Sequence, residues 1–106
     1  MPAIELSLDR LQRLLGRECT VKDLELDLQW IGLDLDDVNE DTIKVEYNPN
    51  RPDFSSPEGI SRALKGYYEM ELGLQQYPLK DSGYEIHVQA AVEPVRPYIV
   101  TAVVRG

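Results

Sequence analysis

Apolar residues recur at helical spacing in two stretches near the start of the chain. The first stretch follows Ser7, a favourable N-cap residue, and stops at Gly16. The second opens at Thr20, where Asp23 three residues later predicts an imperfect capping box, and it stops at Gly32. The pattern therefore predicts two helices, each with one core-facing stripe. The stripes are Leu8, Leu11, Leu14 and Leu15 in the first helix, and Val21, Leu24, Leu28 and Ile31 in the second.

A third helical stretch follows a loop that contains two prolines. Ser56 is predicted to cap it, with Pro57 in the first turn, where the missing N–H costs nothing. Gly73 gives the expected C-terminal stop. The apolar stripe of this helix is Ile60, Ala63, Leu64, Tyr67, Tyr68 and Leu72. Trp30, at the end of the second helix, is expected to anchor the core or its edge, because it closes a buried pattern.

Between the second and third helices the period of the apolar pattern changes to two. Residues 33–38 and 42–47 each alternate, and three polar residues join them, so we expect a β-hairpin. Five of its six acidic residues precede the second strand, namely Asp34, Asp36, Asp37, Glu40 and Asp41. They do not fit the calcium-loop template, which requires a glycine at the sharp turn and a glutamate at its end. A solvated hairpin face is the favoured interpretation.

The last third of the chain returns to a strand-like pattern. Residues 75–83 are typical of a linker. Residues 84–89 alternate as in a half-buried strand, and residues 97–104 are almost continuously apolar, as in a strand covered on both faces. We therefore expect an N-terminal helical and hairpin domain over 1–74, the linker over 75–83, and, over 84–106, strands that begin a following domain. We also expect the protein to continue beyond residue 106.

These elements together predict an α+β fold. Its core would be three helices with a β-hairpin, in a winged-helix-like arrangement, followed by the C-terminal strands.

Charge and cysteine content narrow the functional classes. The chain has 19 acidic residues against 11 Lys and Arg, a net charge of −8, which repels phosphate backbones. Cys19 is the only cysteine, so no internal disulfide can form, and we expect a cytoplasmic location. With His87 as the only histidine, support for a Cys–His pair or a zinc site is weak. We find no secretory signal and no apolar run of bilayer-spanning length, so we expect no membrane partner.

Residues 46–60 are the most distinctive segment of the chain. They run from an alternating strand, through a loop with two prolines, into a capped helix. Asn48 and Arg51 each precede a proline and so favour extended conformations, while the prolines fix their own φ angles. Arg51 can hold a carboxylate with two hydrogen bonds, and Asp53 or Glu58 is near enough in sequence to supply it.

Two interpretations of this loop are open. In the structural one, Asp53 also faces the start of the third helix, and Glu58 pairs with Arg62 four residues later. In the functional one, Asn50, Arg51 and Asp53 bind an RNA phosphate, a metal or a partner. No basic cluster accompanies them, so the structural interpretation is favoured.

The motifs of this segment point to a family. Asn-Arg-Pro-Asp at residues 50–53 precedes Ser-x-Glu-Gly-Ile-x-Arg at 56–62, and Gly-Leu-x-Leu-Asp-Asp-Val stands at 32–38. In this order the chain resembles, over essentially its whole length, the first domain of phenylalanyl-tRNA synthetase beta subunits. Residues 97–106 resemble the entry to the next region of that family, the editing module. Three residues link the two hairpin strands, which leaves no room for the OB-fold inserted in bacterial members, so the resemblance is to the archaeal and eukaryotic branch.

The resemblance implies a cytoplasmic heterotetramer of two alpha and two beta subunits. Its alpha subunit activates phenylalanine with ATP and magnesium and esterifies it to tRNA, and its beta subunit hydrolyses mischarged tyrosyl-tRNA in a region beyond residue 106. A related domain of the family carries magnesium-associated carboxylates after an Arg-x-Asp sequence. This chain keeps Asp53 but has Gly59, Arg62 and Ala63 where the others fall. The resemblance therefore implies no catalytic residue, metal site or cofactor in these 106 residues.

Three functional hypotheses follow. The first is a non-catalytic architectural part of a tRNA ligase. The second is an autonomous winged-helix-like module that binds nucleic acid, which the net charge and the acidic hairpin disfavour. The third is an acidic protein-interaction module. An independent enzyme is least favoured, because no nucleophile–base pair is visible.

Overall fold

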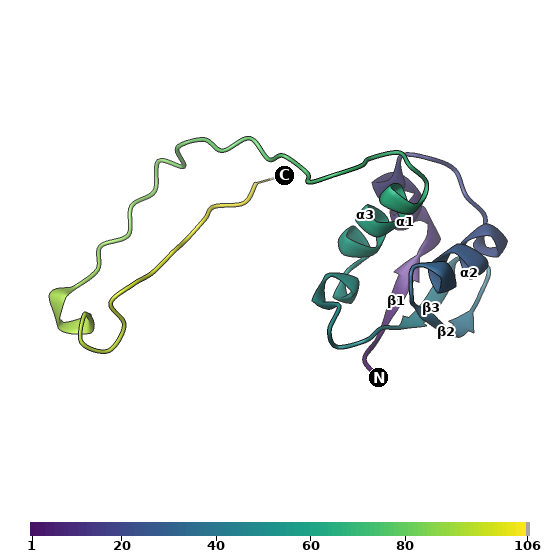
Figure 1. Cartoon of the computed structure of the whole chain (residues 1–106), viewed down its shortest axis with the longest axis horizontal. Helices are drawn as coiled ribbons and strands as arrows, with labels where there is room; N and C mark the ends of the chain where they lie inside the picture. The colour runs from purple at the N-terminus through teal and green to yellow at the C-terminus, as the bar shows by residue number, and fades with distance from the viewer. Residues whose placement is uncertain (106) are drawn as a thin grey trace. The chain divides into compact units, whose positions relative to one another are not determined.

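A three-stranded antiparallel sheet and three α-helices form the fold of the computed structural model, which describes residues 1–105. The prediction of an α+β fold with three helices and a hairpin is confirmed (Figure 1). The chain divides into two units, Met1–Gln75 and the residues that follow. In chain order the elements are β1 (Ala3–Ser7), α1 (Leu8–Leu15), α2 (Val21–Trp30), β2 (Asp34–Val38), β3 (Thr42–Glu46), the 3-10 turn η1 (Pro52–Ser55), α3 (Pro57–Tyr67) and the 3-10 turn η2 (Ala90–Val92).

The sheet has the order β1–β3–β2, so the predicted hairpin is joined by a strand that the sequence analysis missed. β1 pairs antiparallel with β3, and Leu6 lies opposite Ile43. β2 pairs with the other side of β3 through a bulge between Leu35 and Asp37. Leu6, Ile43 and Val45 are almost fully buried, so one face of the sheet contributes to the core.

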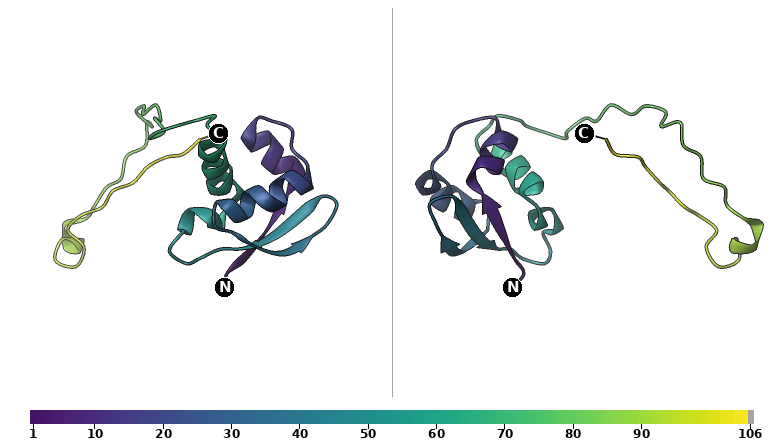
Figure 2. Two further views of the ribbon diagram at one scale, coloured as in Figure 1. Left: turned by 45° about the vertical axis from the view of Figure 1, so that its right-hand side comes forward. Right: turned by 180° about the vertical axis from the view of Figure 1, so that it is seen from behind.

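The core of the first unit lies between this sheet and the helices (Figure 1 and Figure 2). The buried apolar side chains are Leu6, Leu11, Leu15, Cys19, Leu24, Leu28, Leu33, Ile43, Val45, Phe54, Ile60 and Leu64. Every helix and strand of the unit supplies at least one of them or a half-buried neighbour. Burial of this set is the main stabilising contribution to the fold.

The helix starts follow the predicted capping signals. The Ser7 hydroxyl accepts a hydrogen bond from the Arg10 amide at the start of α1. At the start of α2, the Thr20 amide donates to the Asp23 carboxylate at 3.0 Å, and the Asp23 amide donates to the Thr20 hydroxyl at 3.2 Å. The capping box therefore forms although Asp stands where Glu or Gln is usual.

Two expectations for the helices were wrong. Trp30 is 69% exposed, because α2 turns Leu24 and Leu28 to the core and leaves Trp30 on its outer side. α3 ends at Tyr67, before the predicted stop at Gly73. The amides of Glu69 and Met70 donate to the carbonyls of Gly66 and Lys65, which is a Schellman motif with Glu69 in the left-handed region at φ 58°. The predicted stripe residue Leu72 therefore lies outside the helix and is exposed.

The described residues of the second unit, up to 105, do not form the predicted strands. Residues 84–89 and 97–104 are not in strands, and the only regular element among the described residues after 75 is η2. A strand needs a neighbour for its backbone N–H and C=O groups, and no described segment pairs with either stretch in a ladder. Their side chains are exposed accordingly, for example Val100 at 96%. No helix in the described part of the chain has the length and apolar character needed to cross a bilayer.

Candidate functional site

The loop between β3 and α3 is built by short-range backbone and side-chain hydrogen bonds. The Arg51 amide donates to the Asn48 carbonyl at 2.9 Å, and the Phe54 amide donates to the Arg51 carbonyl at 3.0 Å. The Ser55 hydroxyl donates to the Pro52 carbonyl at 2.7 Å. Pro52 opens η1, where its missing N–H leaves no ladder bond unmade. The loop is therefore fixed by its own residues.

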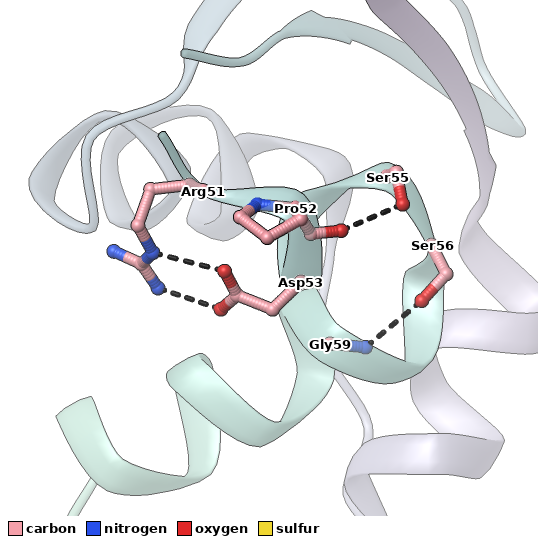
Figure 3. Close-up of polar contacts among 6 residues, drawn as sticks. All are labelled: Arg51, Pro52, Asp53, Ser55, Ser56 and Gly59. Carbon is pink, nitrogen blue, oxygen red and sulfur yellow. Dashed lines mark hydrogen bonds and ion pairs between the residues drawn. The ribbon is translucent and has the colours of Figure 1, made fainter. Parts of the chain in front are cut away.

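Arg51 and Asp53 form a bidentate ion pair (Figure 3). The guanidinium Nε donates to Asp53 Oδ1 at 3.0 Å and Nη2 to Oδ2 at 2.8 Å. The same guanidinium lies over the Phe54 ring, with Cζ 3.7 Å from the ring centroid, and Phe54 is buried. The hydrogen bonds from Arg51 lower the pKa of the Asp53 carboxyl, which therefore stays ionised at neutral pH.

Gly59 brings the first turn of α3 against the loop. Its amide donates to the Ser56 hydroxyl at 3.3 Å, so Ser56 caps the helix as predicted (Figure 3). A Cβ atom placed on Gly59 would lie 1.8 Å from the backbone carbonyl oxygen of Asp53. Only glycine fits this approach. The sequence places Gly59 in a motif, but no local sequence signal indicates this close approach to Asp53.

Glu58 makes a long-range ion pair instead of the predicted pair with Arg62. Its carboxylate accepts a hydrogen bond from the Arg10 guanidinium, which joins α3 to α1. This bond lowers the pKa of Glu58. Arg62 is exposed and makes no ion pair within residues 1–105, but its charge contributes to the lowered pKa of Asp53. Asn50 is also exposed.

A second cross-connection joins α2 to the end of α3. The Tyr68 hydroxyl donates to Asp27 Oδ2 at 2.5 Å, and the Arg17 guanidinium lies 4.3 Å from the Tyr68 ring centroid. Burial and the bond to Asp27 raise the pKa of Tyr68. No sequence signal indicated this contact, because 41 residues separate its two partners.

The arrangement of the loop favours a structural role over a catalytic or ligand-binding role. Asp53 occupies the Nε–Nη2 edge of Arg51, so that edge is closed to a phosphate. Within residues 1–105, no group of three or more His, Cys, Asp or Glu side chains is placed to hold a metal ion. Cys19 is buried, and burial raises the pKa of its thiol, whereas a reactive cysteine requires a lowered value.

Comparison with known proteins gives a consistent set of relatives. The chain is 39% identical to the phenylalanine–tRNA ligase beta subunit of Methanopyrus kandleri over 109 residues, and 41% identical to that of Archaeoglobus fulgidus over 107 residues. Both matches cover 100% of this chain. The chain is homologous to part of the phenylalanine–tRNA ligase beta subunit. It spans 18% and 19% of the lengths of these two relatives. No family model matches.

A solved structure agrees with this assignment. It is the crystal structure of an N-terminal fragment of the phenylalanyl-tRNA synthetase beta subunit from Pyrococcus horikoshii. Superposition gives a TM-score of 0.75 at 31% sequence identity and covers 92% of this chain and 29% of that one. The resemblance drawn from the Asn-Arg-Pro-Asp loop is therefore confirmed, and the homologous part is the N-terminal part of the beta subunit.

Proposed function

We propose that this chain is a non-catalytic, architectural N-terminal module of a phenylalanine–tRNA ligase beta subunit. The observation that carries the proposal is the internal pairing of Arg51 with Asp53 in the loop that the family motif marks. An ion pair closed within the loop positions the backbone, and it commits the Asp53 carboxylate to Arg51. Gly59 and the cap at Ser56 serve the same end, because they fix where α3 leaves the loop.

The activity of the whole enzyme is part of this proposal. By the names of its relatives, the full protein would take part in attaching phenylalanine to its tRNA. The resemblance adds ATP and magnesium as cofactors, an alpha subunit in a heterotetramer of two alpha and two beta subunits, and a cytoplasmic location. The remainder of the beta subunit would be the first partner of this module. Residues 84–106 would begin its following region.

The alternative of an autonomous nucleic-acid-binding module has less support. In helix-turn-helix proteins the second helix enters the DNA groove and presents basic or polar side chains there. In this chain α2 carries Asp23, Glu25 and Asp27 against a single Lys22. Such a helix repels a phosphate backbone.

A chimeric enzyme tests the architectural role. The segment of the Archaeoglobus fulgidus beta subunit that matches this chain is replaced by residues 1–106, and the chimera is expressed with the alpha subunit of the same ligase. We expect the chimera to assemble and to charge tRNA with phenylalanine at a rate close to the parent enzyme. We expect the same chimera carrying Arg51→Ala to give less assembled enzyme, with unchanged kcat per assembled molecule.

The matched control is a chimera carrying Arg13→Ala, because Arg13 forms only an exposed ion pair with Asp9 within α1. It should behave as the unmodified chimera does. A fully assembled Arg51→Ala enzyme with a strongly reduced kcat would contradict the proposal, since the loop would then take part in the reaction.

A further inference from the structure

α2 carries large apolar side chains on two opposite sides. Leu24 and Leu28 are fully buried in the core. Leu26 and Trp30 are 59% and 69% exposed. Because successive residues turn by about 100° around a helix, positions two apart lie on nearly opposite sides and positions four apart lie on the same side. Leu26 and Trp30 therefore form one apolar patch that faces away from the core.

Negative charge is concentrated in the same part of the chain. Residues 18–46, which contain α2, β2 and β3, hold ten acidic residues and two lysines, a net charge of −8. The rest of the chain holds nine acidic and nine basic residues, so this segment accounts for all of the net charge. Within residues 1–105, the only ion pair made by these ten acids joins Asp36 to Lys44 at 2.5 Å. The patch thus lies in a part of the chain with a net charge of −8, and Lys22, four residues before Leu26, is the one basic residue of α2.

The apolar patch and the negative charge together indicate the chemistry of the partner. An exposed tryptophan is typical of an interaction hot spot, and the exposed leucine beside it enlarges the apolar patch. The surrounding charge repels nucleic acids, anionic lipid surfaces and a second copy of this chain. It attracts a surface rich in Lys and Arg, and such complementarity steers association.

We propose that the outer side of α2, formed by Leu26 and Trp30 and flanked by Asp23 and Glu25, is a docking surface for a separate protein. That protein presents Lys and Arg side chains around a large apolar residue. The apolar residue packs between Leu26 and Trp30, while the basic groups meet the acids of the segment. The surface lies on α2 and not on the loop of residues 48–59, so this proposal can be tested independently of the proposed function.

Trp30 supplies a built-in probe, because it is the only tryptophan of the chain. The 106-residue chain is titrated with a synthetic Leu/Lys amphipathic helix of about 18 residues without aromatic side chains, a length at which an isolated helix can form. We expect a saturable blue shift of the Trp30 emission, with an affinity that falls as salt is raised. A Leu/Glu peptide with the same leucine positions should cause no shift. Equal responses to the two peptides, or no response to either, would overturn the proposal.

Substitutions locate the effect on α2. Leu26→Ser should weaken binding of the Leu/Lys peptide at least about tenfold, because the bound peptide buries the leucine side chain but gains no such apolar contact from serine. Met70→Ser is the matched control, since Met70 is an exposed apolar residue outside α2, and it should bind as the unmodified chain does. Equal weakening by both variants would overturn the assignment to α2.

Three further measurements address other occupants of the surface. A blue shift that depends only on the concentration of the chain would indicate self-association, and a shift with an RNA oligonucleotide would indicate nucleic acid. In the chimeric enzyme, Leu26→Ser should leave the thermal stability of the beta subunit unchanged. A large loss of stability there would indicate that the rest of the subunit covers the patch. Each of these three results would overturn the proposal.

Discussion

The two units of this chain contain similar proportions of apolar residues but use them in opposite ways. In the first unit, side chains such as Leu24, Leu28 and Phe54 are at most 1% exposed. In the second, Val100 and Val104 are more than 90% exposed, although their β-branched pattern is typical of a buried strand. The difference lies in long-range partners. β1 pairs with β3 although α1, α2 and β2 lie between them in the sequence, whereas no described segment pairs with residues 97–104.

An apolar pattern therefore determines which side of a segment can be buried, but it does not provide the second segment that buries it. The first unit contains both sides of each contact, so its pattern becomes a core. The loop of residues 48–59 shows the same closure on a smaller scale, since Arg51 pairs with Asp53 and the Ser56 hydroxyl accepts from the Gly59 amide. Substitutions in the core, the loop and the second unit test this contrast.

Phe54→Ala should have the largest effect. Removing this fully buried ring leaves a cavity under the loop and takes away the surface on which Arg51 lies, which costs about 3–5 kcal/mol of unfolding free energy. Val100→Ala in the second unit should leave the unfolding free energy unchanged, because Val100 is exposed. Urea denaturation measures both. Equal losses would show that the two units form one core.

Gly59→Ala should have the second largest effect. It should lower the unfolding free energy by about 3 kcal/mol, because the new methyl group overlaps the Asp53 carbonyl and the backbone must move. Gly66→Ala is the matched control in the same helix. The nearest atom to its added Cβ is 3.9 Å away, so the exchange should stabilise α3 by about 0.5–1 kcal/mol. Thermal melts of both variants check the contrast, and a stable Gly59→Ala variant would contradict the close approach.

Arg51→Ala should lower the unfolding free energy by about 1 kcal/mol, a modest amount because the guanidinium is partly exposed.

The pH dependence of this loss tests the ion pair itself. Bonding to Arg51 lowers the pKa of Asp53 below its ordinary value of 3.8, so this pair stabilises the fold at higher pH. Its contribution is full above about pH 4 and is lost as the pH falls through the lowered pKa. The difference in unfolding free energy between the two proteins should therefore shrink below pH 4. A difference that stays constant on acidification would contradict the ion pair.

Glu69→Gly should give the smallest change, and it should be stabilising. Glu69 holds the left-handed conformation at the end of α3, which costs a non-glycine residue about 1 kcal/mol. Glycine adopts it freely, so the melting temperature should rise. Glu69→Ala keeps the strained backbone and should bring no comparable gain, and a gain with alanine would point to the charge instead.

Local signals predicted the first unit well. The caps at Ser7, Thr20 and Ser56 depend on residues three positions away, and all three form. β1 was missed because Ile4 and Leu6 are too short a pattern without knowledge of β3. Contacts between distant residues could not be predicted either. Glu58 pairs with Arg10, 48 residues away, and not with the neighbouring Arg62.

The errors share one physical cause. Trp30 lies on the side of α2 opposite Leu24 and Leu28, and Leu72 lies beyond the end of α3, so neither apolar side chain is covered. The predicted strands at residues 84–89 and 97–104 have the right composition but no partner within residues 1–105. Sequence patterns predict which side of a segment is apolar, and the rest of the fold decides whether that side is covered.

Amide hydrogen exchange of the 106-residue chain tests the contrast between the units most directly. We predict slow exchange for the backbone amides of β3 and α3, whose opening requires unfolding of the first unit. We predict that residues 84–89 and 97–104 exchange at rates close to those of an unstructured peptide, since no ladder holds their amides. Protection of these two stretches at the level of β3 would contradict the account, because it would mean that the second unit contains its own strand partners.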